Sequence, residues 1–138
     1  MEIIHNASVL TAVGVVGLEL YKYGKTTSIP FHNRDVKTPV DVFKMNQKNG
    51  LHTLFLLDLE PLKNKFMTVN DAVAYLLKRK VSEKQIAIGC AALGSKKQII
   101  RAGTLKELSK FNFNYFPQCL VIPGKFHFVE EEMIEKWK

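Results

Sequence analysis

Strand-like and helix-like sequence patterns alternate along this chain, and the alternation restricts its fold more than any other feature. Residues 51–59 and 86–92 are almost continuously apolar, which is typical of strands covered on both faces of a sheet. Between them, the apolar side chains of residues 69–77 recur at helical spacing, as in a helix packed against a sheet. This order predicts an α/β domain with a mixed, mostly parallel sheet flanked by helices.

Capping signals and turn residues set the expected element boundaries. Capping boxes at residues 68–71 and 104–107 begin two helices. Thr38 is expected to cap another helix, with Pro39 in its first position. We expect strands over 2–5, 26–31, 51–59, 86–92, 98–102 and 119–122, and helices over 9–22, from 38, from 68, over 105–110 and over 129–137. Residues 61–67 show the least pattern and are expected to form a loop.

The apolar content suits a single core. The chain has 138 residues, of which 46% are hydrophobic, so we expect residues 1–138 to form one α/β domain. No apolar run reaches the roughly 18 residues of a membrane span, and the N-terminus lacks the basic segment of a secretory signal. Cys90 and Cys119 lie inside apolar runs, so we expect buried free thiols of a cytoplasmic protein, not a disulfide or a metal site.

The chain is basic, with 20 Lys and Arg residues against 13 Asp and Glu residues and a net charge of +7. Such a charge can indicate a polyanionic partner. However, the basic residues are scattered, and the densest group, residues 78–80, lies at the end of a predicted helix, where cations favour the helix dipole. No zinc finger, helix-turn-helix or RNA-binding aromatic motif accompanies them. We interpret the charge as solvated surface and do not expect a nucleic-acid partner.

The sequence contains no motif for acid–base, nucleophilic or metal-assisted catalysis, so the catalytic residues stay unknown and no metal site is expected. The four histidines show no metal-ligand spacing, and each is expected to be a hydrogen-bonded structural residue. In open α/β sheets, ligands bind beyond the carboxyl ends of the strands. On this basis the candidate site comprises the loops at residues 6–9, 57–60 and 92–95.

Several segments occur in the order and with the spacing of one enzyme family, and together they cover essentially the whole chain. They include Ile4-His5-Asn6-Ala7-Ser8, Gly50-Leu51-His52-Thr53-Leu54, Met67-Thr68-Val69-Asn70, Ile100-Arg101-Ala102-Gly103 and Ile122-Pro123-Gly124-Lys125. As an ordered set they resemble the C-terminal half of the diphthine synthase family. The resemblance implies the fold of the C-terminal domain of tetrapyrrole-methylase-like methyltransferases.

The resemblance also implies an activity, a cofactor and partners. Enzymes of this kind use S-adenosyl-L-methionine, bound between two α/β domains, and release S-adenosyl-L-homocysteine. The implied reaction is methylation of the modified histidine of translation elongation factor 2 in diphthamide biosynthesis. A cytoplasmic homodimer with no membrane partner is expected.

Five positions of this chain match cofactor-contacting positions of the family. They are Ser8, Val9, Leu57, Leu93 and Gln118. Leu93 and Gln118 depart from the residues typical of the family, which leaves contacts through their backbone. The five positions share one cleft only if the strand at 119–122 runs antiparallel to the strand at 51–59, and we predict that it does.

Nothing in the chain matches the glycine-rich strand end or the Gly-Asp-Pro-type loop of the family's N-terminal half. We therefore expect this chain to provide half of a two-domain site and to be inactive without the N-terminal half, in the same chain or in another. Two alternatives remain open at this stage. One is a non-catalytic dimerisation or docking domain derived from the family, and the other is a basic nucleic-acid-binding domain.

Overall fold

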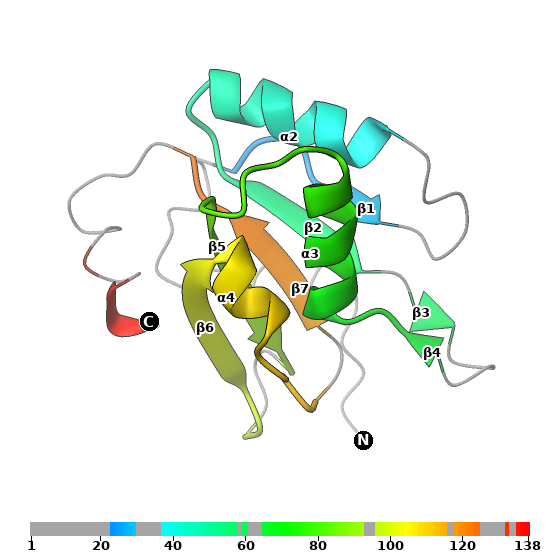
Figure 1. Ribbon diagram of the computed structural model, residues 1–138, viewed down its shortest axis with the longest axis vertical. Helices are drawn as coiled ribbons and strands as arrows, with labels where there is room; N and C mark the ends of the chain where they lie inside the picture. The colour runs from blue at the N-terminus through cyan, green and yellow to red at the C-terminus, as the bar shows by residue number, and fades with distance from the viewer. Residues whose placement is uncertain are drawn as a thin grey trace.

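The fold is built on a five-stranded sheet with the strand order β1-β2-β7-β5-β6 (Figure 1). The computed structural model describes residues 23–29, 37–57, 59–60, 65–92, 96–115, 118–124, 132 and 135–138. The strands of the sheet are β1 (Thr27–Ile29), β2 (Thr53–Leu57), β5 (Ile86–Ala91), β6 (Ile99–Thr104) and β7 (Gln118–Ile122). A separate antiparallel pair, β3 (Leu59–Glu60) and β4 (Lys65–Phe66), follows β2. The sequence pattern did not separate β3 from β2 and missed β4.

The sheet is mixed. β1 and β2 pair in parallel, whereas β2 with β7, β7 with β5 and β5 with β6 are antiparallel. The α/β class with flanking helices is confirmed, but the expectation that the sheet is mostly parallel is wrong for the described strands. The reason is β7, which lies between β2 and β5 and runs opposite to both. Its antiparallel pairing with β2 confirms the prediction on which a single cleft depends.

Side chains alternate between the two faces of the sheet, as the two-residue period of a strand requires. One face carries the larger core, which includes Phe55 and Leu57 of β2 and Leu120 and Ile122 of β7. The opposite face carries a smaller cluster: Leu54, Ile88, Cys90, Ala102, Cys119 and Val121. Both cysteines are buried free thiols, as predicted.

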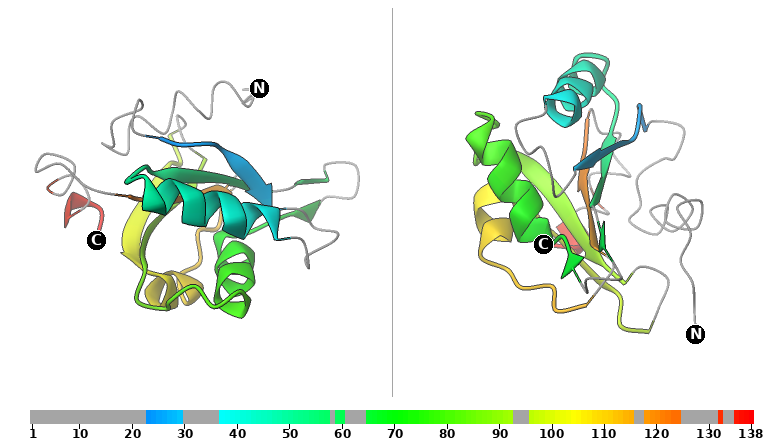
Figure 2. Two further views of the ribbon diagram at one scale, coloured as in Figure 1. Left: turned by 90° about the horizontal axis from the view of Figure 1, so that it is seen from above. Right: turned by 90° about the vertical axis from the view of Figure 1, so that its right-hand side faces the viewer.

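Three helices contribute to the larger core and lie on that face of the sheet. They are α2 (Thr38–Lys48), α3 (Val69–Lys78) and α4 (Leu105–Ser109). Figure 2 shows α3 and α4 side by side against the sheet, while α2 packs along β1 and β2. None of the described helices is long and apolar enough to cross a membrane.

The two capping boxes form as predicted, with the hydroxyls of Thr68 and Thr104 accepting from the backbone N–H groups of Asp71 and Glu107. The prediction that Thr38 caps α2 is wrong. The N-cap is Lys37, whose backbone is already helical (φ −94°, ψ −13°). The helix therefore begins at Thr38, one residue earlier than predicted, and no side chain caps it.

Some predicted elements fall outside the described residues. These are the strand at 2–5 and the helix at 9–22. Of the predicted helix at 129–137, Glu132, Glu135 and Lys136 are helical among the residues described. The carbonyl of Trp137 accepts a hydrogen bond from the Ala102 backbone N–H at 2.9 Å, which ties this end of the chain to edge strand β6.

Candidate functional site

The ends of three neighbouring strands, at Leu57, Ala91 and Gln118, lie side by side at one end of the sheet. We call this end the candidate edge. Ala91, the last residue of β5, pairs with Gln118, the first residue of β7. Cys119 then pairs with Leu56, and Leu57 is the last residue of β2. The register therefore brings Leu57 and Gln118, two of the five predicted cofactor residues, to the same edge.

The backbone turns sharply where β5 ends. Ala92 has φ of 50°, in the left-handed region that non-glycine residues seldom adopt. Such conformations cost free energy and recur where a fold presents backbone to a ligand. Leu93, the next residue, lies outside the described part of the chain, as do Ser8 and Val9. Of the five predicted positions, the structure therefore describes Leu57 and Gln118.

The two described candidates offer different groups. The Leu57 side chain is buried in the larger core, so only backbone groups are available to a ligand at this position. The Gln118 amide is also buried, and it is engaged with protein groups at both ends. Its Oε1 accepts from the Val69 backbone N–H at 2.8 Å, and its Nε2 donates to the Tyr115 carbonyl at 3.0 Å.

Gln118 consequently holds the N-terminus of α3 and the segment before β7 against the edge of the sheet. Sequence reasoning assigned this residue only a cofactor contact and missed both hydrogen bonds. Gln118 and Val69 are separated by 49 positions, and no local pattern links them. The one available signal was that position 118 departs from the family's usual residue.

Asn70 of α3 is a second organising residue that the sequence analysis did not single out for such a role. Its side-chain Nδ2 lies 3.0 Å from the carbonyls of Leu108 and Ser109 and 2.9 Å from that of Phe111. These carbonyls end α4 and begin the segment that leads to β7. A single amide therefore fixes where that segment leaves the helix layer.

Two described titratable residues, His52 and Cys90, are buried within the fold. His52 is fully buried, and its Nδ1 accepts from the Gly124 backbone N–H at 2.8 Å, which confirms the structural role predicted for it. His5, His32 and His127 lie outside the described residues. A hydrogen bond between the Cys90 thiol and Cys119, together with burial, raises the pKa of Cys90 well above its usual range. A thiol in that state is a poor nucleophile at neutral pH.

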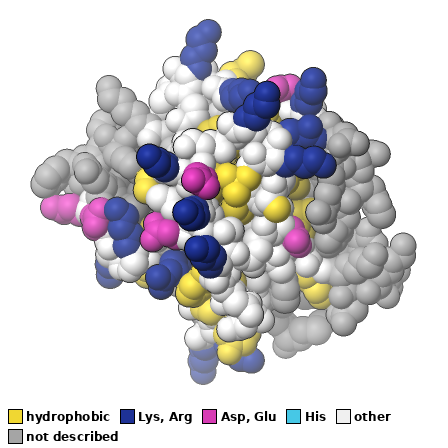
Figure 3. Space-filling model, in the orientation of Figure 1, with side chains coloured by type: hydrophobic (Ala, Val, Ile, Leu, Met, Phe, Trp, Pro, Cys, Tyr) yellow, Lys and Arg dark blue, Asp and Glu magenta, His cyan; other side chains and the backbone are white. Residues whose placement is uncertain are grey.

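No group of three or more possible metal ligands occurs among the described residues. Charged side chains of both signs are scattered over the helix-bearing side of the molecule (Figure 3). The described part of the candidate edge consists of backbone groups at strand ends and of the buried side chains of Leu57 and Gln118. Such a lining can hold and orient an organic ligand and exclude water.

The mixed α/β sheet with flanking helices has the tetrapyrrole-methylase-like fold of solved diphthine synthases. A crystal structure of diphthine synthase superimposes on 98% of the chain with a TM-score of 0.85 at 35% sequence identity. A structure of a proposed diphthine synthase from Entamoeba histolytica superimposes on 99% of the chain with a TM-score of 0.89 at 31% identity.

The sequence comparison agrees. Diphthine synthases from Methanosphaera stadtmanae and Methanococcus maripaludis are 38% and 43% identical to the chain and match 96% of it. No family model matches. The chain is homologous to the C-terminal portion of the diphthine synthases. It spans about half the length of the curated relatives it matches, 54% and 56% for these two.

Proposed function

We propose that this chain provides one wall of the S-adenosyl-L-methionine site of a diphthine synthase. In this proposal Leu57, Leu93 and Gln118 contact the cofactor from the strand ends, and Ser8 and Val9 contact it from the N-terminal loop. The second wall comes from a segment equivalent to the other half of the relatives, in the same chain or in a separate one. The observation that carries the proposal is the meeting of Leu57, Gln118 and the turn at Ala92 at one edge of the sheet.

The chemistry of the edge suits that role. S-Adenosyl-L-methionine supplies an activated methyl group on a sulfonium, so its transfer is a displacement that needs no acid–base dyad in this chain. What the residues of the chain must do is orient the reacting groups and keep water out. Backbone groups at strand ends, together with apolar residues such as Leu57, are sufficient for both tasks.

The proposed acceptor is the modified histidine of translation elongation factor 2, and the proposed place of action is the cytoplasm. We further propose that the assembled enzyme is a homodimer. The support for all three is the homology to diphthine synthases.

Calorimetry with S-adenosyl-L-homocysteine tests the proposal. The chain is titrated alone and after mixing with the separately expressed N-terminal half of the Methanococcus maripaludis relative. We expect binding in the mixture that is at least tenfold tighter than binding to the chain alone. If the mixture binds no S-adenosyl-L-homocysteine, the proposed function is wrong.

A matched pair of variants locates the binding. Ser8→Trp places a bulky group in the proposed site and should weaken binding at least tenfold. Ser82→Trp places the same group on an exposed residue before β5, at the end of that strand remote from Ala91, and should leave binding unchanged. Equal effects of the two variants would place the ligand elsewhere.

A further inference from the structure

Tyr115 is an exposed aromatic residue at the candidate edge. Its side chain is 40% exposed, and only Met45 joins it as an exposed large hydrophobic residue in the described part of the chain. The Lys97 ammonium lies over the Tyr115 ring, with Nζ 5.3 Å from the ring centre. Lys97 precedes β6, and Tyr115 precedes β7. The pair therefore bridges two segments that enter the sheet beside the turn at Ala92.

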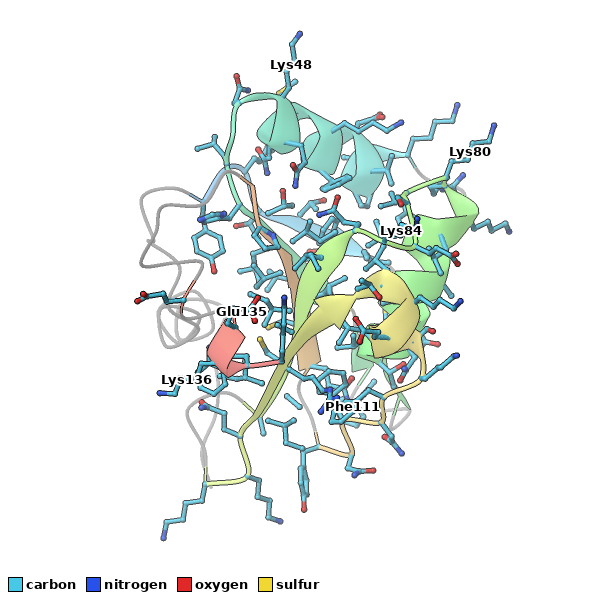
Figure 4. All side chains as sticks on the ribbon, turned by 60° about the vertical axis from the view of Figure 1, so that its left-hand side comes forward. Lys48, Lys80, Lys84, Phe111, Glu135 and Lys136 are labelled. Atoms are coloured by element: carbon cyan, nitrogen blue, oxygen red, sulfur yellow. The ribbon has the colours of Figure 1, made fainter. Side chains whose placement is uncertain are left out.

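The segment that carries Tyr115 is anchored by aromatic packing. Phe113 is buried, and its ring lies so close to Gly89 of β5 that a Cβ there would come within 2.3 Å of the ring. Phe111 packs edge-on against Phe113, with 4.7 Å between ring centres. The Arg101 guanidinium of β6 lies 4.7 Å from the centre of the Phe111 ring. Phe111 lies at the end of the molecule away from Lys48 of α2 (Figure 4).

The backbone around Tyr115 is fixed as well. Asn114 adopts φ of 61°, and its N–H donates to the Asn112 side-chain oxygen at 3.0 Å. The Tyr115 N–H donates to the Phe113 carbonyl at 2.7 Å, and the Tyr115 carbonyl accepts from the Gln118 amide. Tyr115 is thus held through Gln118, a residue of the proposed cofactor wall, and loses little conformational freedom when its ring is covered.

The two segments that carry Lys97 and Tyr115 contain basic residues but no acidic ones. Residues 96–102 and 111–115 contain Lys96, Lys97 and Arg101 and no Asp or Glu. Lys96 and Lys97 are both exposed. A rigid exposed tyrosine beside exposed cations has the composition of an interface hot spot with a polar rim that attracts an acidic surface.

We infer that Tyr115 and Lys97 form part of the contact surface for the protein substrate and bind an acidic segment beside its acceptor side chain. The inference rests on the proposed function for the identity of that protein. It adds a docking role for two residues that no cofactor contact requires. The Tyr115 ring supplies the apolar contact, and Lys96 and Lys97 supply the charge.

The test measures binding to the protein substrate and to the cofactor product separately. The chain, mixed with the N-terminal half of the Methanococcus maripaludis relative, is titrated onto immobilised elongation factor 2 that carries the unmethylated histidine precursor. Tyr115→Ala and Lys97→Glu are each expected to weaken this binding about tenfold. Both should leave the affinity for S-adenosyl-L-homocysteine within about twofold of wild type, and Lys97→Glu should also reduce the salt dependence.

Matched controls come from α2, where Met45 is 67% exposed and Lys48 is exposed nearby. Met45→Ala and Lys48→Glu should bind the elongation factor like wild type. Tyr115→Phe keeps the ring and should retain binding, which separates loss of contact from loss of folding.

Wild-type affinity in both Tyr115→Ala and Lys97→Glu would overturn the inference, as would equal losses in the α2 controls. Binding of the wild-type mixture to RNA but not to the elongation factor would also overturn it. Failure of the proposed function has a different signature, the absence of S-adenosyl-L-homocysteine binding in the wild-type mixture.

Discussion

The close contact between Gly89 and Phe113 predicts that even a methyl side chain at position 89 destabilises the protein. In Gly89→Ala, the new Cβ would lie 2.3 Å from Cζ of Phe113 and within 3.0 Å of two further ring atoms. Carbon atoms in contact normally lie about 3.5–4.0 Å apart, so the ring or the strand must move by more than about 1 Å. Neither moves easily, since Phe113 is 1% exposed and β5 is paired on both sides.

Two effects of this substitution oppose each other. Replacing glycine by alanine in a strand interior favours folding by roughly 0.5–1 kcal/mol through backbone entropy. Overpacking a filled core costs about 1–3 kcal/mol. Because the clash is with a buried ring, we expect overpacking to dominate and the free energy of unfolding to fall by about 1–2 kcal/mol.

Urea unfolding followed by far-ultraviolet circular dichroism measures the change, and a double-mutant cycle identifies its cause. Phe113→Leu shortens the side chain that causes the clash. In that background Gly89→Ala should be close to neutral, which gives a coupling energy of at least about 1 kcal/mol. The reasoning fails if Gly89→Ala is within about 0.5 kcal/mol of wild type, or if it costs the same in both backgrounds.

Three further predictions follow from single contacts. Gln118→Leu leaves the buried Val69 N–H without its acceptor and should lower the free energy of unfolding by about 1–3 kcal/mol, with faster amide exchange at Val69; unchanged exchange would contradict it. Thr68→Ala removes the cap of α3 and should cost about 1 kcal/mol in urea unfolding, and a smaller loss than in the surface variant Lys84→Ala would refute it. For Cys90, the folded pKa is raised, so its contribution to stability is present below the ordinary thiol pKa of about 8.5 and is lost as pH rises through the folded value. The thermal midpoint should therefore fall at alkaline pH more steeply in wild type than in Cys90→Ala, and parallel profiles would exclude this cause.

Local patterns predicted the elements of this fold well. The boxes at Thr68 and Thr104 act between residues three apart, so a single sequence contains all the information that forms them. The buried strands at 53–57 and 86–91 are read in the same way, from uninterrupted apolar residues. The resemblance to a family added the candidate site residues, two of which the structure brings to one edge.

Local patterns did not predict how segments far apart in the sequence pack against one another. Strand–helix alternation favours parallel neighbours, and nothing in residues 118–122 indicates that they insert between two earlier strands. α2 begins at Thr38, one residue earlier than predicted, because its N-cap is Lys37, whose backbone is already helical and which forms no side-chain cap. The role of Gln118 depends on Val69, 49 positions away, and no local sequence pattern links the two residues.

The position of β7 has a consequence for how the chain folds. Without this strand the described sheet is two separate pairs, β1 with β2 and β5 with β6. An isolated two-stranded sheet is marginally stable in water. The central pairings join residues as far apart as Thr53 and Ile122, so closing the sheet carries the entropy cost of a long loop. During synthesis, the described five-stranded sheet can therefore close only after residues 118–122 have been made.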